Sequence, residues 1–200
     1  MAVFELPERA YQAFIFDCDG TLADSMPAHH AAWQRALAAA GANIDFGWEL
    51  FVRRAGKTLE KTVEELNAEF GFALDPHAVA ARQRAEYQGL IPALEAVEPV
   101  VEFLRGVAGR FPISVATGGD RPTVEKTLKS IGIYELIPFI VTAFDVPRGK
   151  PFPDLFLLAA ERMGVSPEVC LVFEDSPLGI EAAERAGMGS VLVTPATHTR

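Results

Sequence analysis

The chain has 200 residues, of which 50% are hydrophobic, so it is long enough for one domain with a sizeable core and a smaller second domain. Its formal net charge of −9 excludes the broadly basic surface that nonspecific binding to nucleic acid or anionic membranes requires. The chain has two cysteines, no apolar run as long as a membrane span and no signal-peptide pattern in residues 1–9, which together predict a cytoplasmic protein.

Short apolar runs rich in β-branched and aromatic residues predict five strands. These runs are residues 13–16, 113–116, 139–142, 169–173 and 191–193. Helical patterns separate the later runs, and they cover residues 122–130, residues 154–163 and the stretch from Pro177 to a stop at Gly187. Because strand and helix alternate, we predict an α/β fold with a doubly wound parallel sheet covered by helices on both faces.

The region from residue 26 to residue 96 interrupts this alternation. It contains several apolar stripes with helical spacing and no convincing strand. The segments at its two ends, residues 24–27 and 97–99, are polar or contain proline, as expected of two hinge crossings. We therefore expect an inserted helical cap domain, residues 26–96, in a catalytic core formed by residues 1–25 and 97–200.

Two acidic residues follow the first predicted strand. Asp17 and Asp19 come directly after the run 13–16 and precede Gly20 and Thr21. A pair of carboxylates at the end of a buried strand is costly unless a metal ion or a proton neutralises it. Ligands of open parallel sheets gather at that end of the strands. The pattern favours a magnesium-assisted phosphoryl-transfer site over the alternative, an Asx turn or helix cap in which the glycine supplies a positive φ.

Three further motifs follow later strands at the same end of the predicted sheet. They are Thr117-Gly118-Gly119, Lys150 within residues 149–154, and Glu174-Asp175-Ser176. Taken singly, each has a purely structural interpretation, namely a turn, an exposed lysine and the acidic start of the helix that begins at Pro177. Since the carboxyl ends of parallel strands share one edge, the coincidence of all four motifs indicates a common site.

With these motifs in this order and a helical insertion between the first and the second, the chain resembles the haloacid dehalogenase superfamily. The likeness is to its branch of sugar-phosphate phosphatases and β-phosphoglucomutases, it covers nearly the whole chain, and it is especially close in residues 149–154 and 172–180. It implies a Rossmann-like core, a small helical cap, Mg²⁺ as cofactor and a small phosphorylated molecule as substrate. We expect a monomer, since none of these features requires a second copy.

The resemblance also implies roles for the catalytic residues. Asp17 would attack phosphorus and form an aspartyl-phosphate. Asp19 would protonate the leaving oxygen and then activate the hydrolytic water. Thr117 would donate its hydroxyl to the phosphoryl oxygens, and Lys150 would hold a positive charge over them.

The same resemblance supplies the expected ligand sets. The residues expected to hold Mg²⁺ are Asp17, Asp19 through its main-chain carbonyl, Glu174 and Asp175. Glu174 is either a ligand or an orienting neighbour. The core residues expected to bind the phosphate of the substrate are Gly20, Thr21, Gly118 and Gly119.

Substrate choice is expected to come from the cap, because the core groups contact only phosphate. The resemblance places Gly56-Lys57-Thr58 as the substrate-specificity loop, with Arg54 beside it. His29 matches a histidine near the hinge of the mutases. The alternatives are that the arginine is a cation at a helix end and that the histidine is an exposed helix residue.

One departure from the mutases bears on the reaction. Mutases of this branch carry an arginine shortly after the loop glycine to hold a second phosphate, and here Leu59 follows Gly56-Lys57-Thr58. We therefore expect a magnesium-dependent phosphatase that acts on a small metabolite such as a sugar phosphate. The alternative is a phosphomutase in which Lys57 replaces the arginine. A nonenzymatic phospho-receiver domain is disfavoured, because receivers carry their acidic pair before the phosphorylated aspartate.

Overall fold

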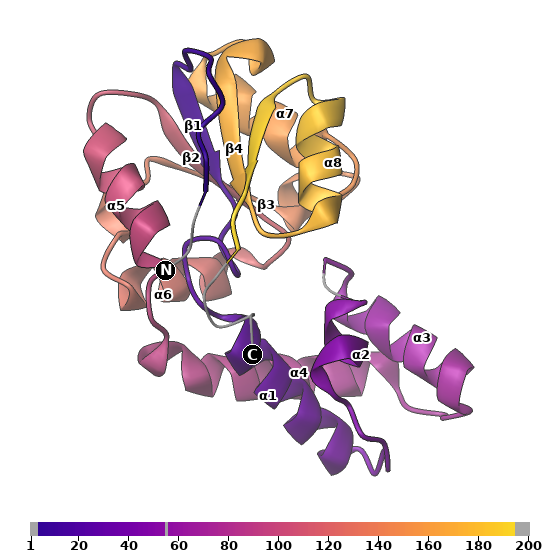
Figure 1. Ribbon diagram of the computed structural model, residues 1–200. Coiled ribbons are helices and arrows are strands. Elements are labelled where there is room, and N and C mark those ends of the chain that lie inside the picture. Colours follow the sequence, from indigo (N-terminus) through magenta and orange to yellow (C-terminus); the bar gives the residue numbers. More distant parts are fainter. Residues whose placement is uncertain (1–3, 55, 195–200) are drawn as a thin grey trace. The chain divides into compact units, whose positions relative to one another are not determined.

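The computed structural model describes residues 4–54 and 56–194, and the chain divides into two compact units (Figure 1). One unit, called the sheet unit here, comprises the chain up to Asp24 and again from Leu94 onward. The other, called the helical unit, comprises Ser25–Ala93. The chain therefore leaves the sheet unit once, shortly after its first strand, and returns to it once.

The sheet unit contains a parallel sheet with strand order β3-β2-β1-β4-β5 in the described part of the chain. The strands are β1 (Ala13–Phe16), β2 (Ile113–Thr117), β3 (Phe139–Thr142), β4 (Cys170–Glu174) and β5 (Gly189–Leu192). Phe14 of the central strand pairs with Ile113 on one side and with Leu171 on the other. All four residues of β1 are buried, as expected of a parallel strand covered on both faces.

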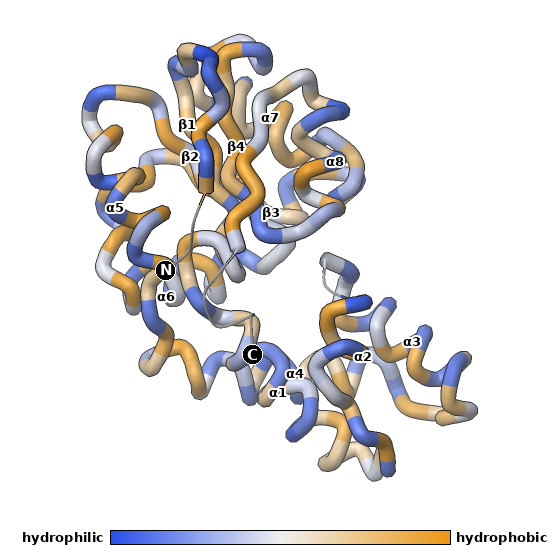
Figure 2. The backbone as a smooth tube through the Cα atoms, in the orientation of Figure 1, coloured by the Kyte–Doolittle hydropathy of each residue, from blue (hydrophilic) through white to orange (hydrophobic). Residues whose placement is uncertain are grey.

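Helices cover both faces of this sheet (Figure 1). They are α5 (Glu98–Val107), α6 (Arg121–Ser130), α7 (Asp154–Met163) and α8 (Pro177–Arg185), with the short 3-10 helices η2 (Tyr134–Leu136), η3 (Ala143–Asp145) and η4 (Pro167–Val169). Phe14 and Phe16 share a hydrophobic cluster with α5 and α6, and Ala13 and Ile15 share one with α7 and α8. The α/β prediction is confirmed, and the strongly hydrophobic β1 and β4 are visible in Figure 2.

The boundaries of the last strand differ from the prediction. Residues 191–193 were expected from their β-branched side chains, whereas β5 begins at Gly189 because Gly189 and Ser190 pair with residues of β4. Glycine and serine carry no strand preference, so this pairing depends on the neighbouring strand and not on local sequence.

The helical unit consists of α1 (Met26–Ala39), α2 (Trp48–Val52), α3 (Leu59–Phe70), α4 (Pro76–Leu90) and the 3-10 helix η1 (Ile91–Ala93). Within its described residues it has no strand. Trp33, Phe46 and Leu66 belong to its own buried cluster. Asp75 caps α4, because its side chain accepts hydrogen bonds from the first-turn N–H groups. None of the described helices combines the length and the apolar character needed to cross a membrane.

Candidate active site

Asp17 lies at the carboxyl end of the central strand. Its N–H donates to the carbonyl of Phe173 in β4 at 2.9 Å, which continues the sheet ladder to this residue, and its side chain is buried. The chain then turns sharply, since Leu22 and Ala23 both donate to the carbonyl of Cys18 at 3.0 Å. Gly20 adopts a φ of 84° in this turn, a conformation that favours glycine. The turn interpretation of this motif is therefore compatible with the catalytic one, which stays a prediction.

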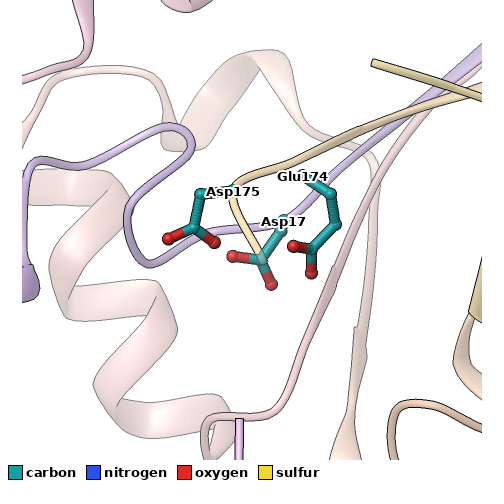
Figure 3. A group of neighbouring side chains, drawn as sticks. All are labelled: Asp17, Glu174 and Asp175. Carbon is teal, nitrogen blue, oxygen red and sulfur yellow. The ribbon is translucent and has the colours of Figure 1, made fainter. Parts of the chain in front are cut away.

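Glu174 and Asp175 at the end of β4 complete an acidic group with Asp17 (Figure 3). One oxygen from each carboxylate lies within 4.8 Å of the others. Three carboxylates offer only oxygen ligands, the donor set that Mg²⁺ prefers. The residues present therefore fit a magnesium ion. The expected contribution of Asp19 is a main-chain carbonyl, so the absence of its side chain from this group is compatible with that expectation.

Burial and mutual repulsion raise the pKa values of two of these acids. Burial raises the pKa of Asp17 to about 7, the charges of Glu174 and Asp19 add to the rise, and Lys150 opposes it. Burial, followed by the charges of Asp17 and Glu174, raises the pKa of Asp175 well above its usual range. Negative charge in the site exceeds what the protein itself compensates, which is a second reason why a divalent cation fits here.

Lys150 provides the positive charge that the protein does supply. Its Nζ donates to Asp17 Oδ1 at 2.6 Å and also donates to Glu174 Oε1, and its side chain is only 7% exposed. Burial alone would lower the pKa of Lys150, but the two carboxylates outweigh it and hold the pKa above its usual value. The ammonium group is therefore charged and lies directly beside the predicted nucleophile.

The motif after β2 lies close to Asp19. The hydroxyl of Thr117 accepts a hydrogen bond from the N–H of Gly119 at 3.1 Å, which folds the turn after the strand. A Cβ atom added to Gly119 would lie 3.6 Å from Thr117 Oγ1 and 3.9 Å from Asp19 Oδ2. The structure thus brings these predicted residues together. Thr21 belongs to the motif after β1, and its buried hydroxyl has no hydrogen-bond partner in the described part of the chain.

Two residues for which the sequence analysis gives no individual role contact Glu174. The N–H and the hydroxyl of Ser176 donate to Glu174 Oε2 at 2.6 and 2.8 Å. Gly179 lies against the same side chain, where a Cβ would collide with the carboxyl group. Ser176 also caps α8, because its hydroxyl accepts a hydrogen bond from the N–H of Gly179. The sequence signal for this contact was Gly179, a residue without a side chain in the first turn of the helix that follows Glu174 and Asp175.

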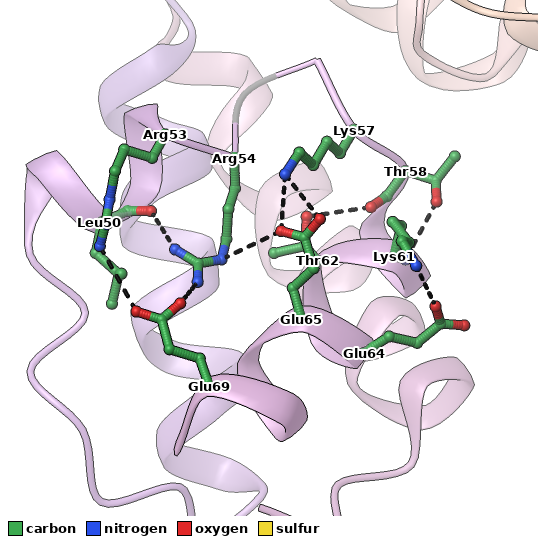
Figure 4. Close-up of polar contacts among 10 residues, drawn as sticks. All are labelled: Leu50, Arg53, Arg54, Lys57, Thr58, Lys61, Thr62, Glu64, Glu65 and Glu69. Atoms are coloured by element: carbon green, nitrogen blue, oxygen red, sulfur yellow. Dashed lines mark hydrogen bonds and ion pairs between the residues drawn. The ribbon is translucent and has the colours of Figure 1, made fainter. Parts of the chain in front are cut away.

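In the helical unit, Lys57 and Arg54 are engaged by acidic residues of α3 (Figure 4). Both oxygens of Glu65 accept from Lys57 Nζ, at 2.7 and 2.8 Å. Arg54 is buried, pairs with Glu69 and donates to the carbonyl of Leu50 at 3.0 Å. These contacts give both cations partners inside their own unit. Their assignment to substrate binding stays a prediction.

The other two predicted substrate ligands of this unit also have local roles. The hydroxyl of Thr58 caps α3 by accepting from the N–H of Lys61 at 3.2 Å. The ring of His29 stacks on Tyr87 with a centroid distance of 3.7 Å, and its Nδ1 lies 3.4 Å from Nε2 of Gln83. His29 therefore joins α1 to α4, and its contact with a substrate stays a prediction as well.

Comparisons with known proteins show the family to which the chain belongs. The sequence model of the family described as "Hydrolase: haloacid dehalogenase-like hydrolase" matches residues 11–187. The chain is 37% identical over 186 residues to the fructose-1-phosphate phosphatase YqaB of Escherichia coli (strain K12), covering 90% of this chain and 95% of that protein. It is 34% identical over 192 residues to the validoxylamine A 7'-phosphate phosphatase of Streptomyces hygroscopicus subsp. limoneus, covering 94% of this chain and 87% of that protein.

A solved structure has the same fold. The β-phosphoglucomutase of Clostridium difficile superposes with a TM-score of 0.77 at 25% identity, covering 90% of this chain and 83% of that chain. The family match spans most of the chain and includes all four motifs. The resemblance stated from the motifs is confirmed, and the protein is an enzyme that belongs to the haloacid dehalogenase-like hydrolase family.

Proposed function

We propose that this enzyme is a magnesium-dependent phosphatase that hydrolyses a small sugar phosphate through an aspartyl-phosphate intermediate. The observation that carries the proposal is the contact between Lys150 and Asp17 beside the carboxylates of Glu174 and Asp175. A buried nucleophile, a fixed ammonium group and an oxygen-only metal site are what phosphoryl transfer requires. The E. coli and Streptomyces relatives named above are both phosphatases by name, which supports hydrolysis.

In the proposed first step, an Asp17 oxygen attacks phosphorus, and the bond between phosphorus and the leaving oxygen breaks. Asp19 gives its proton to that oxygen, so the product leaves as an alcohol. Asp19 then removes a proton from water, which attacks the aspartyl-phosphate and releases inorganic phosphate. Lys150 and Thr117 hold the phosphoryl oxygens, together with the N–H of Gly118. Bound Mg²⁺, held by the predicted ligands, would offset the charge of the phosphoryl oxygens.

The phosphomutase alternative is less well supported. It requires a cation in the helical unit to replace the arginine that the mutases place after the loop glycine. Lys57 is the candidate, and both carboxylate oxygens of Glu65 already bind it.

The name of the E. coli relative also supports a sugar phosphate as the substrate class. We further propose that the enzyme acts in the cytoplasm as a monomer, where its two buried cysteines remain thiols.

Phosphorus NMR on a panel of sugar phosphates tests this proposal. The panel includes fructose 1-phosphate, and β-glucose 1-phosphate with its bisphosphate activator, each with Mg²⁺. Growth of the inorganic phosphate signal, stopped by EDTA and absent in Asp17→Asn, is the expected result. Asp75→Asn is the matched control, because asparagine also caps a helix and Asp75 lies in the helical unit. Conversion to a 6-phosphate without phosphate release would support the mutase instead.

A further inference from the structure

The segment that carries Lys150 is closed at its base by an ion pair. Arg148 Nε and Nη2 donate to the two carboxylate oxygens of Asp154 at 3.1 and 3.0 Å. Such a two-pronged pair fixes both the distance and the orientation of its partners, which a single contact does not. Asp154 is the first residue of α7, so one end of the pair belongs to a packed helix. The pair ties the beginning of the segment to this helix.

The tip of the segment is held by two guanidinium groups. Phe152 N donates to the carbonyl of Gly149 at 3.0 Å, which forms a tight turn around Lys150. The Cζ of Arg148 lies 4.5 Å from the ring centroid of Phe152, and that of Arg185 lies 5.8 Å from it. Arg185 also donates to the carbonyl of Pro151 at 3.3 Å. Since Arg185 belongs to α8, the turn is attached to a second helix.

Lys150 needs this support because of its own length. A lysine side chain has about four rotatable bonds, and holding its ammonium group in one place costs conformational entropy. Its Nζ nevertheless contacts Asp17 and Glu174 and lies 5.4 Å from the ring centroid of the buried Phe156. A mobile backbone would add to that cost. The attachments of the turn keep the backbone of Lys150 in one position.

We propose that Arg148 is a positioning residue, which acts through Asp154 and Phe152 to keep the ammonium group of Lys150 beside Asp17. Arg148 is itself exposed and has no place among the four motifs, so its effect is indirect. The inference rests on the proposed phosphatase function for its effect on rate, and on the geometry alone for its effect on Lys150.

The first test measures how reactive the amine of Lys150 is, and it requires no measurement of catalytic activity. Amine acetylation is followed at Lys150 by peptide mass spectrometry in the wild type, Arg148→Ala and Arg110→Ala. The control removes a guanidinium that lies 5.7 Å from the ring of Phe111, a similar contact before β2. We expect Lys150 to react several-fold faster in Arg148→Ala and at the wild-type rate in Arg110→Ala. An unchanged rate in Arg148→Ala would overturn the proposal.

The second test measures phosphate release. We expect Arg148→Ala to lower kcat about tenfold with little change in KM, and Arg148→Lys to recover little, because lysine provides neither the two-pronged pair nor the planar stack. Asp154→Asn breaks the same pair from the other side and should act in the same direction. In a Lys150→Ala background, Arg148→Ala should cost less than about twofold further.

The two tests separate the possible failures. A full additional loss in the Lys150→Ala background would mean that Arg148 acts independently of Lys150, and it would overturn the inference. A wild-type protein that releases no phosphate from any sugar phosphate would overturn the proposed function. In that case the acetylation rates of Lys150 still decide whether Arg148 positions it.

Discussion

Gly179 lies so close to Glu174 that a single added Cβ would occupy the space of the glutamate carboxyl group. That carboxyl group cannot move aside without losing the hydrogen bonds from Ser176 and Lys150. Gly179→Ala should therefore displace Glu174 and lower the rate of phosphate release by tenfold or more, on the order of the loss of one fixed polar contact in a catalytic site.

The matched control for this substitution is Gly106→Ala in α5, where an added Cβ would meet nothing within 4 Å. It should leave the rate unchanged and stabilise the protein by up to about 1 kcal/mol, because alanine has a higher helix propensity than glycine. Phosphate release and thermal unfolding are measured on both variants. Equal rates for Gly179→Ala and the wild type would show that Glu174 tolerates displacement.

The crowding of Asp17, Glu174 and Asp175 predicts that Mg²⁺ stabilises the protein. At about 100 times its Kd, the ion should add roughly 2.7 kcal/mol and raise Tm by roughly 5–10 °C. Asp175→Asn removes one of the mutually repelling charges. The metal-free variant should therefore unfold at a higher temperature than the metal-free wild type, and Mg²⁺ should raise its Tm much less. Scanning calorimetry in buffers matched for ionic strength checks both; an equal shift in both proteins would contradict the metal site.

Asp145 predicts a loss of stability in acid. Partial desolvation of its carboxyl group would raise its pKa, but hydrogen bonds from the N–H and hydroxyl of Thr142 and from Arg162 outweigh desolvation and lower the pKa from 3.8 to about 2. A lowered pKa means that the contribution is fully present above about pH 4 and is lost as the pH falls toward 2. Asp145→Asn should cost roughly 1–2 kcal/mol at pH 7, and less below pH 4.

Urea unfolding of the wild type and Asp145→Asn at several pH values between 2 and 7 measures this difference. Glu161→Gln, at an exposed position of α7, is the control and should change the free energy of unfolding by less than about 0.5 kcal/mol. A difference between Asp145→Asn and the wild type that stays constant across this range would show that the charge of Asp145 has no part in it.

The ion pair of Glu69 with the buried Arg54 predicts a local effect in the helical unit. Glu69→Gln leaves a buried guanidinium with a weaker partner and should cost roughly 1 kcal/mol, given that Glu69 itself is partly exposed. Glu64→Gln makes the same change on the same helix, at an exposed residue that pairs with the exposed Lys61, and should cost less than about 0.5 kcal/mol. Both tryptophans of the chain, Trp33 and Trp48, lie in this unit, so tryptophan fluorescence reports its unfolding selectively.

The sequence predicted the sheet, and the gathering of its motifs at one edge, for a physical reason. Buried parallel strands are continuous apolar runs, and their carboxyl ends share one edge, so motifs that follow such runs must gather there. The contact of Asp17 with Lys150, 133 positions later, is a consequence of that topology. The start of β5 was misplaced because Gly189 pairs through its backbone alone.

Contacts that depend on side-chain conformation could not be read from motifs. The close approach of Gly179 to Glu174 and the two-pronged pair of Arg148 with Asp154 need the turn of each loop to be known. In the same way, Arg54 has the residue type of a substrate ligand, but its burial and its pairing with Glu69 of α3 emerge only from the folded helical unit.

The insertion of the helical unit after β1 imposes an order on folding. Phe14 pairs with Ile113 and Leu171, so the central strand leaves the ribosome long before either of its neighbours has been made. Ser25–Ala93, by contrast, has a buried cluster drawn from its own residues and can pack before β2 and β4 are available to pair with β1. A nascent chain that stops before Cys170 carries the predicted nucleophile, Asp17, beside a strand that is flanked on one side only, and it lacks Glu174 and Asp175.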